Sequence, residues 1–391
     1  MTGKKILSIV FLMIIFGCGA LTLWNGKYEL KQIPVEGNYS ANRVETVLQE
    51  NMAGRYGWIN INGLFLKTIG ATYVKGGSSG IGDLGFDDTY KLRDGALTYT
   101  LSKQDVIPFA DNLDKLNETV KAKGAELIYA QLPYKIESDE QMPKGAKEYG
   151  NENADELLSA LDERDIKYLD LRQEIKKDGI DWGSMFFLTD HHWTPRAAIW
   201  AAEKLFETIS HELDIEFNGD LYDLSNYNIK LYEDWFLGSL GKRTGKYYAG
   251  VDDIELITPK FETSFDFFAV WEEGEVKRKG NFEDVMFDMS QLSEKDYYAL
   301  SAYSAYIGYD YAYNTIVNND APNDIKILLL RDSYSCAMLP FLSINAKEIT
   351  AVDLRHYDGN VSELVENGDF DVVLIAYNPY VIMKTMFDFG D

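Results

Sequence analysis

Two short polar stretches, far apart in the chain, contain the side chains that an acyl-transfer catalyst needs. Asp190 and His192 lie within Thr-Asp-His-His-Trp-Thr-Pro, which holds two of the four histidines of the chain. Ser333 follows the apolar run Ile-Lys-Ile-Leu-Leu-Leu and an Arg-Asp pair. A carboxylate can orient an imidazole, and that imidazole can take the proton of a serine that attacks an ester. We therefore predict a Ser-His-Asp hydrolase or acyltransferase with Ser333 as the nucleophile, His192 as the base and Asp190 as its partner.

The same residues also have ordinary structural explanations. A serine at position 333 could cap the N-terminus of a helix, and taken alone this is the better interpretation. Asp332 is an alternative cap, and Ser335 is the rival nucleophile. The Asp-His-His triplet at 190–192 could hold a metal, but adjacent residues rarely point to one ion, so we expect neither a metal nor a cofactor.

The elements that must position these residues alternate between strands and helices. Strands are predicted over 125–132, 166–171, 185–188, 325–330, 349–354 and 372–376, and helices over 104–122, 153–164 and 195–213. Such alternation predicts an α/β fold with a flavodoxin-like parallel sheet and helices on both faces.

Polar residues follow four of the predicted strands and should meet at one edge of the sheet, because ligands bind at the carboxyl ends of parallel strands. Asp190 and His192 follow one strand, while Ser333, Arg355 and Asn378 follow three others. We expect the backbone N–H of Ser333 and the side chain of Asn378 to form an oxyanion hole. Arg355 is expected to contact the substrate.

The N-terminal residues 1–25 differ from the rest of the chain. Two lysines precede an apolar stretch over 6–24, which is about long enough to cross a bilayer as a helix. Basic residues before the stretch favour a cytosolic N-terminus and an exported body. We predict an uncleaved signal anchor; lipidation of Cys18 after cleavage is the alternative, although Phe16 is bulky for that motif.

The remaining chain divides into a stem with a packing helix over 26–85 and a catalytic domain over 86–391. Residues at about 215–320 are rich in Tyr, Phe, Asp and Asn, and we predict a long insertion of loops and short strands over the edge of the sheet. Its glycine-rich segment 236–245 is followed by a strand-like segment rather than the helix that a phosphate-binding loop requires. A structural loop lining the cleft is expected there, with Arg243 as a substrate contact.

The net charge of −25 argues against a nucleic-acid partner, because phosphates would be repelled. It argues mildly against a strongly anionic polymer, unless a local basic cleft overrides the overall field. Two cysteines, one in the apolar segment and one beside the serine turn, give no disulfide framework and no thiolate metal site.

The Asp-His-His-Trp quartet at 190–193, upstream of the Asp-Ser turn at 332–333, resembles that of SGNH-hydrolase-like proteins. The similar groups are the DHHW proteins and the alginate O-acetylation proteins AlgJ and AlgX, in which the serine also comes last. The resemblance covers roughly residues 45–391. Further segments that look like family blocks are 62–70, 133–135, 238–245 and 331–335. Arg331 stands where the family usually has glycine, and no Gly-x-Asn-Asp block is present.

The resemblance implies an SGNH-like fold, the same Ser-His-Asp triad and O-acyl chemistry on an exported glycan. We expect an extracellular, membrane-anchored O-acetyltransferase that acts on a cell-surface polysaccharide beside a membrane-bound O-acyltransferase partner. The alternatives are an esterase of the same fold and a non-catalytic glycan-binding assembly protein. The residues expected to contact the substrate are Arg243, Arg331, Tyr134, Lys135, Trp193 and Arg355. Of these, Trp193 fits packing better than stacking on a sugar.

Overall fold

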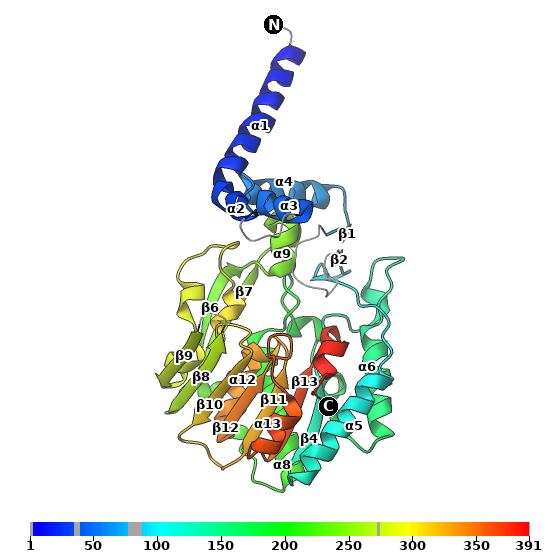
Figure 1. Ribbon diagram of the computed structural model, residues 1–391, viewed down its shortest axis with the longest axis vertical. Helices are drawn as coiled ribbons and strands as arrows, with labels where there is room; N and C mark the ends of the chain where they lie inside the picture. The colour runs from blue at the N-terminus through cyan, green and yellow to red at the C-terminus, as the bar shows by residue number, and fades with distance from the viewer. Residues whose placement is uncertain (1–2, 35–39, 77–87, 272–273, 391) are drawn as a thin grey trace.

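The computed structural model describes residues 3–34, 40–76, 88–271 and 274–390, and one mixed sheet forms its centre (Figure 1). The strand order is β5-β4-β13-β11-β12-β10-β8-β9; the first five strands are parallel and the last three antiparallel. The bounds are β4 Glu126–Gln131, β5 Lys167–Asp170, β8 Phe265–Trp271, β9 Gly274–Gly280, β10 Tyr313–Asn318, β11 Lys326–Arg331, β12 Glu348–Val352 and β13 Val372–Tyr377.

Helices cover both faces of the parallel half. α12 (Ser335–Asn345) joins β11 to β12, and α13 (Val361–Asn367) joins β12 to β13. These connections run in opposite directions across the sheet, so right-handed crossovers place the two helices on opposite faces. α12 packs on α8 (Pro195–Leu213), whereas α13 packs on α5 (Ile107–Ala122), which also contacts α6 (Gly150–Asp162). The predicted α/β fold, with helices on both faces of a largely parallel sheet, is confirmed.

Helix α8 shows how local sequence fixes an element that leads directly from the Asp-His-His-Trp turn. The side chain of Thr194 caps the helix by accepting a hydrogen bond from the backbone N–H of Ala197, and Pro195 occupies the first turn. The helix has the predicted bounds, 195–213, because cap, proline and apolar stripe all agree.

The segment predicted as a strand over 185–188 is instead a 3₁₀ turn, Trp182–Met185, followed by a single bridge between Phe186 and Trp193. Met185, Phe186 and Phe187 are buried in the core, whereas Leu188 is exposed and its carbonyl oxygen accepts a hydrogen bond from the backbone N–H of Leu97 at 2.8 Å. The Asp-His-His turn therefore sits in a tight loop rather than at the end of a sheet strand.

The region at about 215–320 contains longer strands than the sequence predicted. β6 (Tyr227–Phe236) and β7 (Asp252–Pro259) form a separate antiparallel pair. β8 and β9 join the main sheet through β10, so this region widens the sheet as well as covering its edge. Alternate residues of β8 are buried, which is the period-two pattern of a half-covered strand.

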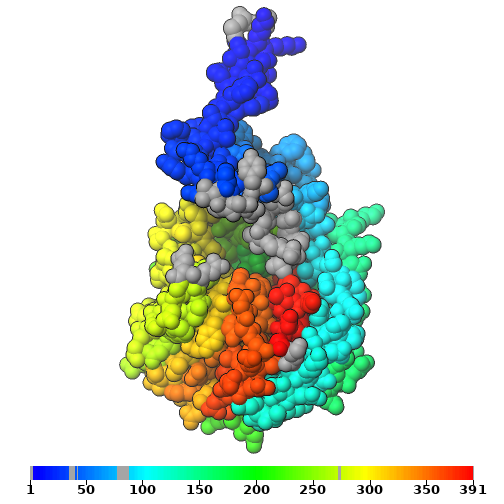
Figure 2. Space-filling view, viewed as in Figure 1, coloured from blue at the N-terminus to red at the C-terminus, as the bar shows by residue number. Residues whose placement is uncertain are grey.

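The N-terminal elements lie together at one end of the molecule (Figure 1). They are α1 Gly3–Asn25, α2 Lys27–Gln32, α3 Ala41–Glu50 and α4 Arg55–Thr68, followed by the small sheet β1 Tyr73–Val74, β2 Thr89–Lys91 and β3 Leu97–Thr98. α1 stands clear of the body in the space-filling view (Figure 2), and none of it is buried. By length and composition, α1 could cross a membrane.

Helix α4 rests on two short helices of the body, α9 (Ser239–Thr244) and α10 (Lys246–Ala249). A Cβ atom at Gly63 would come within 2.5 Å of the carbonyl oxygen of Thr244, so only glycine permits this approach. The remaining short elements are α7 Leu171–Lys177, α11 Phe282–Met286 and the 3₁₀ turns Asp139–Gln141, Gly219–Tyr222, Leu224–Asn226, Met289–Leu292, Ala302–Ala305, Pro379–Val381 and Lys384–Phe387.

Candidate active site

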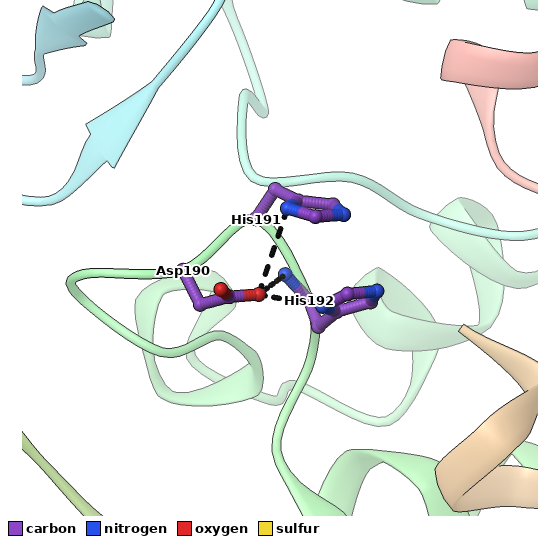
Figure 3. A group of neighbouring side chains, drawn as sticks. All are labelled: Asp190, His191 and His192. Atoms are coloured by element: carbon purple, nitrogen blue, oxygen red, sulfur yellow. Dashed lines mark hydrogen bonds and ion pairs between the residues drawn. The ribbon is translucent and has the colours of Figure 1, made fainter. Parts of the chain in front are cut away.

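Ser333, His192 and Asp190 form one hydrogen-bonded line. The Ser333 Oγ lies 2.8 Å from the His192 Nε2, and the His192 Nδ1 lies 2.5 Å from the Asp190 Oδ1. Figure 3 shows the imidazoles of His191 and His192 beside the Asp190 carboxylate. If the ionised carboxylate accepts a hydrogen bond from Nδ1–H, Nε2 is left as an acceptor for the serine hydroxyl. The structure thus brings together the three side chains predicted for catalysis.

The serine turn joins β11 to α12 and leaves one hydroxyl accessible. Asp332 accepts hydrogen bonds from the backbone N–H groups of Tyr334 (2.8 Å) and Asn378 (2.8 Å). The side chain that caps the backbone at the start of the turn is therefore that of Asp332 and not that of Ser333. The Ser333 side chain is half-buried, whereas the Ser335 Oγ is fully buried and has no hydrogen-bond partner in the described part of the chain. Ser333 is therefore the better-placed nucleophile of the two.

Asp190 is held by the first residue of α9. The backbone N–H of Ser239 donates to the Asp190 Oδ2 at 2.6 Å, and the backbone N–H of His192 donates to Oδ1 at 3.0 Å. Burial alone would raise the pKa of Asp190, but the neighbouring imidazoles and these hydrogen bonds hold it well below its usual range. Gly238 packs against the backbone of Asp190 so closely that a Cβ could not fit. The glycine-rich segment, predicted to be a loop, is thus a short helix that orients the aspartate.

His191 faces the same carboxylate but not the serine. Its Nδ1 lies 3.2 Å from the Ser239 Oγ and 3.6 Å from the Asp190 Oδ1. Burial, with the adjacent His192 imidazole, lowers the pKa of His191 to about 3, so it is neutral at ordinary pH. Both ring nitrogens of His192 are already engaged by Asp190 and Ser333, which fits a proton relay better than the alternative of a metal bound at 190–192.

Two residues, Tyr303 and Asp252, contribute to the site although no sequence motif marks them. The ring of Tyr303 stacks on the His192 imidazole at 4.1 Å and 12°, and its hydroxyl lies 3.0 Å from the carbonyl oxygen of Ser333. Asp252, the first residue of β7, accepts hydrogen bonds from the backbone N–H groups of Leu188 (2.7 Å) and Thr189 (2.8 Å). Nothing separates Tyr303 from the other 25 tyrosines until the chain is folded.

A cluster of ion pairs lies directly behind the serine turn and is called here the ion-pair cluster: Arg331, Asp310, Arg355 and Asp353. The Arg331 side chain is fully buried; it contacts Asp310 at 3.3 Å and lies 3.9 Å from Asp353. Arg355 reaches Asp353 at 2.5 Å and Asp310 at 3.4 Å. Burial would raise the pKa of Asp310, but the two guanidinium groups lower it far more. Because arginines already neutralise both carboxylates, they do not offer a site for a cation.

The structure corrects the predicted role of Asn378. Its Nδ2 donates to the Asp332 Oδ2 at 2.7 Å, and its Oδ1 accepts from the backbone N–H of Tyr380 at 2.7 Å. The amide is buried and does not line the cavity at Ser333. Asn378 therefore orients Asp332 instead of facing a developing oxyanion.

Three of the predicted substrate contacts are buried in the core and are likewise corrected. Trp193 has no exposed surface and donates from Nε1 to the carbonyl oxygen of Tyr334 at 2.9 Å, so it packs rather than stacks on a sugar. The Tyr134 hydroxyl donates to Glu148 at 2.7 Å. The buried Lys135 ammonium donates to backbone carbonyl oxygens, among them that of Asp190. These side chains build the walls of the site and do not reach a ligand.

The three arginines that were predicted to contact the substrate lie in two different places. Arg331 and Arg355 are engaged in the ion-pair cluster and do not line the cavity at Ser333, contrary to the prediction that they contact the substrate. That cavity, of about 370 Å³, is lined by Asp190, His192, Ser333 and Tyr303, among others. Arg243 lines a neighbouring cavity of about 440 Å³.

The site lies beside a mixed α/β sheet, and two family models match parts of the chain that contain its residues. Residues 94–223 match a family model described as SGNH hydrolase-like domain, acetyltransferase AlgX. Residues 180–352, which include His192 and Ser333, match the model of the DHHW proteins. The resemblance of this chain to the DHHW and AlgX-type proteins, predicted from its motifs, is confirmed.

Solved structures agree on the fold. PatB1 of Bacillus cereus is 22% identical, with a TM-score of 0.64 over 75% of this chain and 96% of that one. The same protein with a sulfonyl adduct gives 22% identity and a TM-score of 0.63, over 76% and 95% of the two chains. A DHHW family protein from Eubacterium siraeum is 18% identical, with a TM-score of 0.59 over 80% and 97%. No curated protein matches the chain by sequence.

Proposed function

We propose that this protein is a membrane-anchored, extracellular O-acetyltransferase that transfers an acetyl group through Ser333 onto a cell-surface polysaccharide. The observation that carries the proposal is the 2.8 Å contact between the Ser333 Oγ and the His192 Nε2, continued at 2.5 Å from Nδ1 to Asp190. The similarity to a family model described as an acetyltransferase supports acetyl transfer as the reaction.

The geometry fits a two-step transfer. In the first step, the Ser333 Oγ gives its proton to the His192 Nε2 and attacks the carbonyl carbon of an acetyl ester. The tetrahedral intermediate collapses, the bond to the donor oxygen breaks, and His192 returns the proton to that oxygen. In the second step a sugar hydroxyl gives its proton to His192 and attacks the acetyl-serine, which releases the acetylated sugar and regenerates the Ser333 hydroxyl. Asp190 stabilises the imidazolium in both steps.

The backbone N–H of Ser333 remains our proposed oxyanion donor. Among the described residues, no protein acceptor bonds this N–H, while the adjacent N–H of Tyr334 is taken by Asp332. A free N–H at the nucleophile itself is positioned to stabilise the oxygen that becomes negative during attack.

The membrane anchor is supported by two neighbouring elements. α1 has the length and apolar composition of a membrane span. α4, at the same end of the molecule, exposes Trp58 (40%), Ile61 (60%), Phe65 (59%) and Ile69 (59%) on one face. Their spacing is that of one helical stripe, and an exposed apolar stripe beside a span is typical of a surface that lies against lipid. We expect the full chain to stay in the membrane fraction after alkaline carbonate extraction; release of intact protein would contradict the anchor.

The decisive experiment uses Ser333→Ala in the full chain. The unmodified protein should turn over a small acetyl ester and show a mass increase of one acetyl group on the peptide that contains Ser333. Ser333→Ala should lose both while keeping its thermal unfolding midpoint, with Ser335→Ala as the matched control that keeps both. Unchanged turnover in Ser333→Ala would refute the acyl-enzyme.

Transfer and hydrolysis differ only in the acceptor. With an acetyl donor and a glycan supplied together, we expect acetylated sugar in excess over free acetate. Predominantly free acetate would identify an esterase of the same fold. A membrane-bound O-acyltransferase is our proposed source of the acetyl group, since the anchor would hold the Ser333 cavity next to such a partner; co-purification of the two full-length proteins tests it.

A further inference from the structure

A second cavity adjoins the one at Ser333. It has a volume of about 440 Å³ and is lined by parts of α3, α4 and α9, the end of β1 and Tyr298. Ser239 and Lys242 line both cavities, so the two hollows share a wall at the start of α9. Nothing in the two-step transfer uses this second cavity.

The charge of the cavity is opposite to that of the chain. Among the described residues that line it, Arg55, Lys75, Lys242 and Arg243 are cations, and none is a carboxylate. The whole chain has 63 acidic and 38 basic residues, so a lining of this size would be expected to include acidic side chains. Asp88 lies next to the lining, but its carboxylate bonds a backbone N–H and a tyrosine hydroxyl.

Two of the cations have no anionic partner among the described residues. Within the described part of the chain, no ion pair or hydrogen bond engages the side-chain nitrogens of Arg55 or Lys75. Lys242 donates to the carbonyl oxygen of Leu300 at 2.8 Å, and burial lowers its pKa even though nearby Asp190 raises it. Like charges gathered in a partly desolvated cavity repel one another, and an anion bound among them relieves that repulsion.

The cavity also has an aromatic wall. The rings of Tyr56 and Tyr298 stack at 4.1 Å with an angle of 15° between their planes. Both residues line the cavity, and the Tyr298 hydroxyl is fixed by a 2.8 Å hydrogen bond to Asn60. A rigid aromatic surface beside cations suits a ligand that has both a sugar face and a negative charge.

We infer that this cavity binds an anionic substituent, a carboxylate or a phosphate, of the glycan that is acetylated at Ser333. The inference rests on the proposed function and names its substrate class: an acidic polysaccharide whose charged group sits beside α4 while a nearby hydroxyl reaches the serine. The negative field of the whole protein repels such a polymer at long range, but cations in contact with the substituent act over a few ångströms and select it there.

Binding is measured by calorimetry on full-length Ser333→Ala in detergent micelles, so that no turnover interferes. The probes are a galacturonic acid hexamer, a glycerol phosphate hexamer and neutral maltohexaose. At least one anionic hexamer should bind about tenfold or more tightly than maltohexaose, and its affinity should fall as salt is raised, because salt screens charges. Which of the two binds identifies the substituent.

A charge-matched pair of variants locates the site. Arg55→Gln with Lys75→Gln should weaken the anionic hexamer by about tenfold or more. Lys144→Gln with Lys147→Gln removes the same charge from exposed positions outside the cavity and should change affinity by less than about twofold. If the first pair lowers the thermal unfolding midpoint, Lys75→Gln alone, at an exposed position, is compared with Lys144→Gln alone.

Two results would overturn the inference: neither anionic hexamer binding better than maltohexaose, or both variant pairs weakening binding equally. The latter would mean that only net charge matters. The proposed function is tested separately, because the turnover of a small acetyl ester by the unmodified protein and by Ser333→Ala is measured without either hexamer.

Discussion

Two buried polar clusters flank Ser333, and they differ in how completely their groups are satisfied. The relay of Asp190 and His192 ends on a half-buried hydroxyl that opens into a cavity. In the ion-pair cluster the Arg331 and Asp353 side chains are fully buried and each charge meets an opposite one, while Asp310 remains partly exposed at the wall of the same cavity. The relay thus ends on a hydroxyl that faces the cavity, whereas the charges of the ion-pair cluster are paired with one another.

Because of this difference, a substitution in each cluster should change a different measured property. A change in the relay leaves most packing intact and should be seen in turnover. A change in the ion-pair cluster leaves an uncompensated buried charge and should be seen in stability.

The largest effect is expected for Asp190→Asn. The neutral amide no longer stabilises the imidazolium and can favour the wrong tautomer of His192, so kcat for a small acetyl ester should fall by about 10⁴-fold. Steady-state kinetics measures the loss, and circular dichroism checks that the variant is folded. A decrease of less than tenfold would mean that the relay is not the catalytic unit.

The next effect is on stability and comes from Arg331→Met. The change leaves the buried Asp353 and the half-buried Asp310 with one guanidinium fewer, and the free energy of unfolding should fall by about 3–5 kcal/mol. Arg196→Met is the matched control: Arg196 forms an exposed pair with Glu255 at 2.7 Å, and its loss should cost less than about 1 kcal/mol. Equal losses of unfolding free energy in denaturant titrations would show that the buried and the exposed arginine pairs contribute equally to stability.

Asn378→Ala tests whether Asn378 contributes to stability or to catalysis. Removing the amide deprives the buried Asp332 of one donor, so unfolding should become easier by about 1–3 kcal/mol. The kcat of the folded enzyme should change by less than about tenfold. A drop of about 10²–10³ without loss of stability would instead restore Asn378 as an oxyanion donor.

The smallest effect is the pH dependence contributed by His191. Its pKa is about 3 in the folded protein and about 6.5 when unfolded, so below pH 6.5 the unfolded chain takes up a proton that the folded one refuses. This stability is present above pH 6.5 and is lost as the pH falls toward 3. Because the side chain keeps 22% exposure, we expect about 1 kcal/mol between pH 7 and pH 5.

His191→Phe, which cannot titrate, should show a smaller loss of unfolding free energy over that interval than the unmodified chain. Comparing the two proteins cancels the other titrating groups, including Asp332, whose pKa burial raises to about 6. Identical pH dependence in both proteins would show that His191 does not titrate differently on folding.

Much of the fold was predictable because local rules agreed with one another. The apolar runs of β4, β11 and β13 are the pattern of strands buried on both faces, and the cap and proline of α8 mark its start. That Ser333, His192 and Asp190 lie together was predictable because so few histidines exist and one follows an aspartate by two residues. The sequence predicted Ser333 over Ser335, and the buried hydroxyl of Ser335 supports that preference.

The rest depends on tertiary contacts that no local pattern contains. Trp193, Tyr134 and Lys135 lie in segments that resemble family blocks, and the resemblance predicted substrate contacts there, whereas in the structure these side chains build the frame. The partners of the relay, the Ser239 N–H and the Tyr303 ring, come from the region at 215–320, which lacks a helical period. Strand pairing of β8 and β9 with the main sheet likewise requires knowing which edge is available.

The contact at Gly63 links distant parts of the molecule. One end of the six-residue helix α9 touches α4 through Thr244, and the other end donates the Ser239 N–H to Asp190. A helix of that length is about 9 Å long and behaves as a short rigid rod. A displacement of α4 is therefore expected to change the orientation of the Asp190 carboxylate, so the packing of α4 and the alignment of Asp190 with His192 are mechanically coupled.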